Sequence, residues 1–284
     1  MKNLLTVVGG GDAAPVLEAA LLTARRFDSH IVGLHSFGSD YADTFDGEMG
    51  VSIASDFNHR ADRDGHKRRS QARSFFRGFM NSRDVPVGAI TVGHDGPSAS
   101  WLERDDHQNP IVGIVGRAYD LTVVEQPRKL ASIAGVTFEK ALFESGRPVL
   151  MVPKVDLPVL GEVIAIAWNG STETAQTVAL GMPLLERSQR VIIIAVDPQD
   201  MPEPGPTGEE LAHALERCGM SVSLHTAVGR QTAQGASFLR EAEAAGADLL
   251  LKGAYTRSRI RQMIFGGATR HIILESRMPV LMAR

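Results

Sequence analysis

The chain has 284 residues, more than one compact core usually spans, which favours two domains of ordinary size. Hydrophobic residues make up 43% and charged residues 22%, which is typical of a folded chain and excludes a disordered or low-complexity one. The formal net charge of −3 gives no bulk attraction to nucleic acid or to an anionic membrane, so neither is expected as a partner.

Targeting and metal signals are absent from the sequence. The apolar runs are too short to span a bilayer, and the Met1–Val8 stretch is too short for a signal peptide. The single cysteine, Cys218, excludes an internal disulfide and a multi-cysteine metal cage. The nine histidines form no helical pair with metal-ligand spacing, so we expect no metal site. These features predict a cytoplasmic protein.

In chain order, the first predicted strand is Leu4–Val8, which runs into a Gly-rich turn. Residues 60–79 are predicted to form an amphipathic helix, with an apolar stripe of Ala72, Phe75, Phe76 and Phe79. A further strand is predicted at Asp120–Val124. The Gly-, Asp- and Ser-rich stretches Ser36–Asn58 and Gly93–Asn109 are interpreted as loop insertions.

The second half alternates short apolar runs with helical stretches. The runs are rich in Val, Ile and Leu without clean alternation, which indicates parallel strands covered on both faces. We predict these strands at Glu162–Trp168, Arg190–Val196, Ser221–Thr226, Asp248–Lys252 and Pro279–Ala283.

Two helices of the second half have recognisable patterns. A helix after Ser171 is predicted to take that serine as its N-cap. Its expected buried stripe consists of Ala175, Val178, Ala179, Met182 and Leu185. Cys218 falls on a helical stripe with Leu211 and Leu215, which favours a buried hydrophobic residue over a nucleophile.

An internal repeat relates the two halves. The segment Glu144–Met151 recurs as Glu275–Met282, and each copy follows a strand opened by an aspartate, Asp120 or Asp248. The repeat predicts two α/β domains, residues 1–157 and 158–284. We expect each to be a five-stranded parallel sheet sandwiched by helices, with the two domains related by pseudo-two-fold symmetry through their last strands.

The segment Lys252–Thr269 begins at the carboxyl end of a predicted strand and runs into a helix, where ligands bind in open α/β sheets. Glycines allow backbone N–H groups to approach a phosphate, which makes Gly266, Gly267 and Thr269 a candidate cradle. The alternative is a pair of tight turns that only connect strand to helix.

At this segment the chain resembles the universal stress protein family, whose nucleotide-binding members carry Gly-x2-Gly-x9-Gly-(Ser/Thr) after the fourth strand. Gly253 and Gly266 stand where that pattern needs them. Thr256 replaces the second glycine and Gly267 replaces the serine or threonine, although Thr269 supplies a hydroxyl two residues later. The resemblance implies tandem Rossmann-like domains of the UspA type, related to the HUP fold, and an adenine nucleotide such as ATP as the ligand of the second domain.

The resemblance also implies contacts at the ends of the first two strands of the second domain. Asn169 occupies the place of the family's acidic residue, and Ala167 and Val196 would lie against an adenine. For Trp168 two readings stay open, because an aromatic ring there either stacks on a base or fills the pocket where the base would sit.

The first half departs further from the family pattern. Glu125-Gln126-Pro127 follows its fourth strand where the glycine loop should begin, and a glutamate there would repel phosphate. We expect no nucleotide in this domain and interpret it as structural or regulatory.

The resemblance to the universal stress protein family implies two alternative functions. The first is a stress-response regulator whose second domain binds an adenine nucleotide; the second is a nucleotide-free protein-interaction module of the same fold. Neither a Gly-x-Ser-x-Gly elbow nor a Gly-x4-Gly-Lys-(Ser/Thr) loop is present, so no catalytic residue is assigned and an enzyme is not expected, with weak nucleotide hydrolysis left open. A protein partner is expected but unidentified, and a homodimer is left open.

Overall fold

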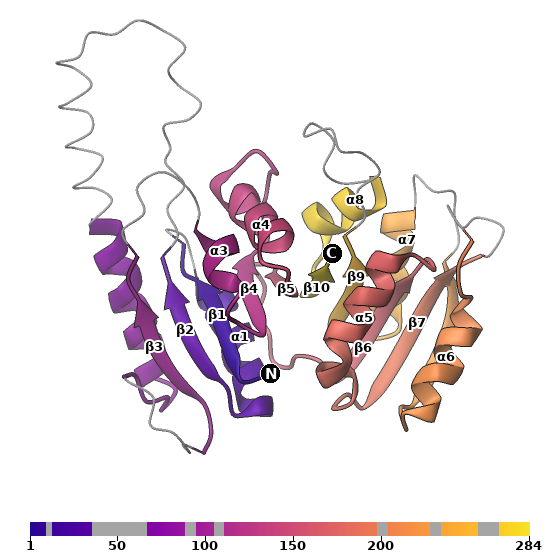
Figure 1. Ribbon diagram of the computed structural model, residues 1–284, viewed down its shortest axis with the longest axis horizontal. Coiled ribbons are helices and arrows are strands. Elements are labelled where there is room, and N and C mark those ends of the chain that lie inside the picture. The colour runs from indigo at the N-terminus through magenta and orange to yellow at the C-terminus, as the bar shows by residue number, and fades with distance from the viewer. Residues whose placement is uncertain are drawn as a thin grey trace, which may run out of the picture.

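The structure is a computed structural model of the 284-residue chain. It describes residues 1–9, 13–35, 67–88, 95–104, 111–197, 204–227, 234–254 and 267–284. Within these ranges the chain forms one ten-stranded sheet with helices on both faces, as Figure 1 shows.

The first half supplies five parallel strands, which lie in the order β3-β2-β1-β4-β5. Their bounds are β1 Asn3–Val7, β2 His30–Leu34, β3 Ser98–Leu102, β4 Leu121–Glu125 and β5 Val149–Val152. The second half repeats the order as β10-β9-β6-β7-β8, again with parallel pairing. Its strands are β6 Val163–Trp168, β7 Arg190–Val196, β8 Val222–Ala227, β9 Leu249–Gly253 and β10 Val280–Ala283.

The two halves join edge to edge. β5 and β10 pair in the antiparallel direction, with Leu281 opposite Leu150. Because the strand order is mirrored about this pair, it coincides with a pseudo-two-fold axis. The predicted α/β fold of two tandem five-stranded parallel sheets is confirmed. The connection between β5 and β6 contains the predicted domain boundary at residues 157 and 158, which stays a prediction.

Each face of the sheet is covered by its own set of helices. One face carries α1 (Ala14–Phe27), the helix over residues 67–81, α5 (Thr172–Leu185) and α6 (Gly208–Arg217). The opposite face carries α3 (Val112–Gly116), α4 (Ile133–Glu144), α7 (Gln234–Ala244) and α8 (Gly267–Glu275). None of the described helices is long and apolar enough to cross a membrane.

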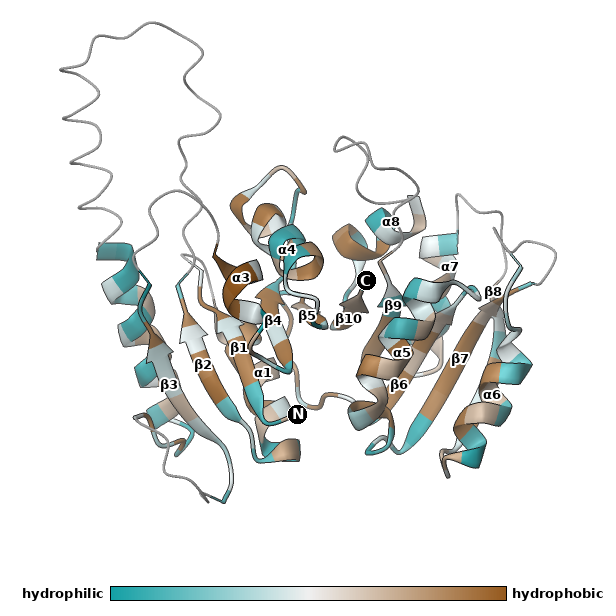
Figure 2. Cartoon of the chain, in the orientation of Figure 1, coloured by the Kyte–Doolittle hydropathy of each residue, from teal (hydrophilic) through white to brown (hydrophobic). Residues whose placement is uncertain are grey.

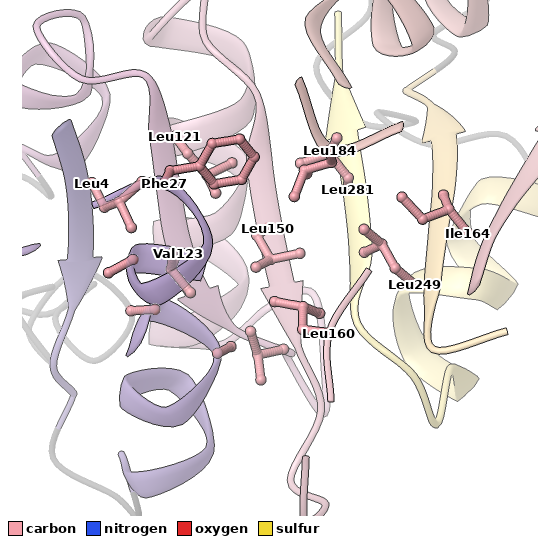
Figure 3. Packing of buried hydrophobic residues seen from close by; sticks show 14 of the residues in the cluster. Leu4, Phe27, Leu121, Val123, Leu150, Leu160, Ile164, Leu184, Leu249 and Leu281 are labelled. Atoms are coloured by element: carbon pink, nitrogen blue, oxygen red, sulfur yellow. The ribbon is translucent and has the colours of Figure 1, made fainter. Parts of the chain in front are cut away.

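Each face has one apolar layer that runs through both halves. The layer under α1 and α5 extends from Leu4 in β1 across Leu150 to Ile164 in β6, as Figure 3 shows. In Figure 2 the central strands are brown along much of their length, whereas the edge strand β3 is paler and the helices carry teal positions. Burial of strands on both faces explains why their sequences lack alternation.

The repeated aspartates perform the same local role in both halves. Asp120 accepts hydrogen bonds from the backbone N–H groups of Lys2 and Asn3, at 2.6 and 2.9 Å. Asp248 likewise accepts from the N–H groups of Glu162 and Val163, both at 2.9 Å, and from Gly161. Each aspartate therefore fixes the entry of the first strand of its half beside the fourth.

Polar side chains also tie the halves together. Arg26 at the end of α1 donates to the carbonyl of Leu160 at 2.8 Å and to that of Arg187 at 2.5 Å. The guanidinium of Arg187 in turn lies 4.2 Å from the centroid of the Phe27 ring. On the other face, Gln126 donates to the carbonyl oxygens at the end of α8. The junction is thus held on both faces of the sheet.

One predicted loop is wrong in part. Residues 98–102, inside the expected insertion Gly93–Asn109, form the parallel edge strand β3. Its sequence, Ser-Ala-Ser-Trp-Leu, has no β-branched residue. The buried imidazole of His30 holds it, because Nδ1 and Nε2 lie 2.8 and 2.7 Å from the hydroxyls of Ser98 and Ser100. The other predicted insertion, Ser36–Asn58, lies outside the described residues.

Three predicted stripes need correction. On the helix over 67–81, Ala72 and Phe76 are buried, but Phe75 is 45% exposed. On α5 the buried face is rotated away from Ala175 and Ala179, which are exposed, and consists of Thr174, Thr177, Val178, Gly181, Leu184 and Leu185. Cys218 is exposed, because α6 ends at Arg217 and the cysteine is its C-cap.

Candidate functional site

The candidate site lies where β6 and β9 end. β6 pairs with β7 on one side and β9 on the other, and the chain leaves β6 toward β7 through α5. This is the point where the strand order reverses and neighbouring connections diverge, which is where open α/β sheets bind ligands. Ala167 is buried at the end of β6, and Val196 at the end of β7, both on the sheet face covered by α7 and α8.

The turn after β6 is organised around the amino end of α5. Ser171 is the N-cap, as predicted, and its hydroxyl accepts a hydrogen bond from the Thr174 N–H. Asn169 Oδ1 accepts from the Thr174 hydroxyl at 2.7 Å and from the Ser171 N–H at 3.3 Å. The side-chain oxygen of Asn169 is therefore engaged in holding the start of the helix.

Trp168 is packed in the core, with 3% of its surface exposed. Its indole N–H donates to the carbonyl of Pro206 at 2.8 Å, in the segment that leads into α6. The ring belongs to the apolar layer under α5 and α6, opposite the face to which Ala167 and Val196 contribute. Trp168 is therefore a core aromatic residue, and its ring does not fill the place where a base was expected beside Ala167 and Val196.

Gly253 ends β9 directly beneath the start of α5. A Cβ atom at this position would lie 2.4 Å from the Thr174 backbone nitrogen and 2.6 Å from the Glu173 carbonyl carbon. Both are backbone atoms, so no side-chain rotation could relieve the contact. A glycine is therefore required here by the close packing of α5 on β9.

Lys252, beside Gly253, is a site residue that the sequence reasoning missed. It is 3% exposed, and its Nζ donates to the Gly253 carbonyl at 2.8 Å. Burial lowers the pKa of this amine from 10.5 to about 8, an effect that the nearby Glu173 partly opposes. The side chain still carries a positive charge at neutral pH for most of the time. No sequence signal revealed it, because a lysine at the end of an apolar run reads as the exposed end of a strand.

The first turn of α8 faces the same end of the sheet. Gly267 begins the helix and is exposed, with open space where a Cβ would stand, whereas Thr269 is buried. Gly235 in α7 packs against this turn, because a Cβ there would lie 2.6 Å from the Ala268 carbonyl oxygen. Thr256 and Gly266, the other two predicted loop residues, lie outside the described residues.

The equivalent position in the first half is chemically different. β4 ends at Glu125 where β9 ends at Gly253, and the Glu125 carboxylate pairs with Lys154 Nζ at 2.8 Å. Within the described ranges, no three His, Cys, Asp or Glu side chains lie close enough together to hold a metal ion.

Comparisons with known proteins find similarity to one family. The sequence profile of the universal stress protein family matches residues 193–284, which run from within β7 to the end of β10 and include the site residues from Lys252 onward. The universal stress protein Slr1230 of Synechocystis is 25% identical over 174 residues, which are 58% of this chain and 58% of that relative. The carboxy-terminal third of the chain therefore matches the universal stress protein family.

Solved universal stress proteins share the fold over the whole length. The protein from Archaeoglobus fulgidus superposes with a TM-score of 0.65 at 14% identity, covering 99% of this chain and 96% of that one. The putative universal stress protein from Pseudomonas aeruginosa gives a TM-score of 0.53 at 15% identity, covering 100% and 93%. At these identities the likeness concerns the fold alone.

Proposed function

We propose that this protein is a universal stress protein, a cytoplasmic stress-response regulator whose second domain binds an adenine nucleotide, such as ATP. The nucleotide would lie at the carboxyl ends of β6 and β9, with the base toward Ala167 and Val196. The phosphates would contact the segment from Gly253 to Thr269. Phosphate binding would order this segment and change the surface offered to a protein partner, so the protein would act through conformation and not through turnover.

The observation that carries the proposal is the setting of Lys252. A buried ammonium group at the carboxyl end of β9 contributes positive charge where the strand order reverses. The amino end of α8 adds partial positive charge at the same end of the sheet, and Gly267 leaves its backbone uncovered. An anionic ligand would offset the cost of burying the lysine charge.

The second candidate, a nucleotide-free interaction module, has its own support. The absence of a side chain at Gly253 is explained by its packing against α5, so that glycine needs no ligand to account for it. In addition, Ile114, Ile133 and Val136 are exposed on α3 and α4. Exposed apolar side chains of this kind suit a protein partner, including a second copy of the chain.

Isothermal titration calorimetry with ATP, ADP and AMP distinguishes the two candidates. The first predicts binding heat that Gly266→Val removes and Gly78→Val retains; Gly78 lies in the helix over 67–81 with open space around it. Absence of heat and of any thermal shift at millimolar nucleotide would favour the interaction module. Steady phosphate release above that of a Thr269→Val variant would instead indicate hydrolysis.

A further inference from the structure

A cavity of about 510 Å³ opens at the carboxyl ends of β1 and β4, in the half of the chain that lacks the glycine loop. Figure 1 shows α4 near this end of the sheet, beside β4. The cavity is bounded by the end of β1, the end of β4 and the first turns of α4, and its place in the first half corresponds by pseudo-symmetry to the carboxyl ends of β6 and β9. The residues that line this cavity differ from those of the second half, so it suits a different class of ligand.

The walls of the cavity are mainly apolar. Val7 and Val124 form the side that belongs to the sheet, and Ile133 and Ala134 form the side that belongs to α4. Gly9 leaves the β1 side open, because a Cβ there would meet only the Glu125 Oε2, at 3.8 Å. Such walls suit a ligand with a hydrocarbon body.

The charged side chains that line the cavity carry a net positive charge. The Glu125 carboxylate is balanced by Lys154, whose Nζ lies 2.8 Å from Oε1. Arg128 also lines the cavity and adds a second positive charge. The amino end of the 12-residue α4 contributes partial positive charge beside them, since Ser132, its N-cap, and the two residues that follow line the cavity.

Thr137 supplies an independent sign of a polar ligand. Its side chain is one turn into α4, lines the cavity and is only 5% exposed. Among the described residues, no side-chain hydrogen bond is formed by its hydroxyl. Ser132 differs, because its hydroxyl already accepts from the Gly135 N–H at 3.1 Å. A buried hydroxyl that faces a cavity without a partner is a donor that a ligand can use.

We propose that this cavity binds a small organic monocarboxylate with an apolar tail. The carboxylate lies between Arg128 and the amino end of α4, with the Thr137 hydroxyl donating to it, and the tail packs against Val7 and Val124. A polyphosphate does not suit the site, because the Glu125 carboxylate stands where the second half has Gly253. A single negative charge matches the single arginine that remains after Glu125 and Lys154 pair.

Three probes with six-carbon chains test the ligand class on the full-length protein by calorimetry: hexanoate, hexanamide and hexylamine. We expect hexanoate to bind at least about tenfold more tightly than the other two, since only it forms charge-assisted hydrogen bonds with a positive site. Arg128→Gln should weaken hexanoate binding about fivefold to tenfold. Lys129→Gln removes the same charge from the adjacent residue, which does not line the cavity, and should leave binding unchanged.

Ala134→Phe tests the location, because a larger side chain there fills the cavity, and it should abolish hexanoate binding while circular dichroism shows an intact fold. Four results would overturn the proposal. They are no hexanoate binding at millimolar concentration, tighter binding of hexylamine, an Arg128→Gln variant that binds as wild type does, and competition between ATP and hexanoate.

Discussion

Gly253→Ala tests whether the glycine at the end of β9 is required by packing. The added Cβ would lie 2.4 Å from the Thr174 nitrogen, against an ordinary contact of 3.4–4 Å, so the start of α5 must move away by about 1 Å. Overpacking of this kind costs about 1–3 kcal/mol. For a chain of this size that corresponds to a fall in Tm of roughly 2–6 °C.

The matched control is Gly267→Ala, at the exposed start of α8, where a Cβ meets open space. It should leave Tm unchanged or raise it slightly, because alanine is the better helix former. Differential scanning calorimetry of both variants without ligand measures the contrast. If Gly253→Ala melts together with wild type, the close approach of α5 to β9 is not what requires the glycine, and a ligand contact becomes the better explanation.

Two further predictions concern the first half. Arg26→Ala removes two hydrogen bonds across the junction and should lower the free energy of unfolding, measured in urea, by about 1–2 kcal/mol. The control Arg25→Ala, at an exposed position, should change this free energy by less than about 0.5 kcal/mol. Equal effects of the two variants would contradict a role for Arg26 in joining the halves. Burial lowers the pKa of His30 below 6.5, so the folded state binds fewer protons than the unfolded state, and stability should fall as the pH drops below about 6.5. The His30→Gln variant should lose less stability than wild type between pH 7.5 and 5.5, and an unchanged loss would refute this assignment. The pH dependence that remains in the variant includes the contribution of His35, whose pKa is also lowered by burial.

The strands of the second half were predictable to within one or two residues. Their runs of Val, Ile and Leu, such as the one that forms β7, are long and closed by turn residues. The junction was also predictable, because the repeated segment that ends in β5 and β10 implied a two-fold relation. The opening aspartates, Asp120 and Asp248, turned out to hold the first strand of each half.

Other features depend on partners that are distant in sequence. β3 could not be predicted from its own residues, because His30 on the neighbouring strand holds its two serines. The buried face of α5 includes Thr177, whose hydroxyl donates to the Glu173 carbonyl at 2.8 Å and accepts from the Ala283 N–H at 3.2 Å. Hydropathy alone places such a threonine at the surface, which rotates the predicted stripe.

The sequence predicts where the candidate site lies, but it does not predict the charge and burial of the side chains there. Strand order and the glycine pattern pointed to the carboxyl ends of β6 and β9, yet the buried state of Lys252 could be learned only from the three-dimensional packing around the end of β9. In the first half, Glu125 suggested that phosphate would be repelled. No sequence pattern indicated that Glu125 pairs with Lys154, a pairing that leaves Arg128 as the unbalanced charge of the cavity.

The most direct test of the account is native mass spectrometry of the full-length protein with added ATP, because it counts ligands on each chain. We predict one ATP per chain for wild type and none for Gly266→Val, since only the second half is proposed to take a nucleotide. A chain that stays bare at millimolar ATP, or one that takes two ATP molecules, would contradict the division of roles between the two halves.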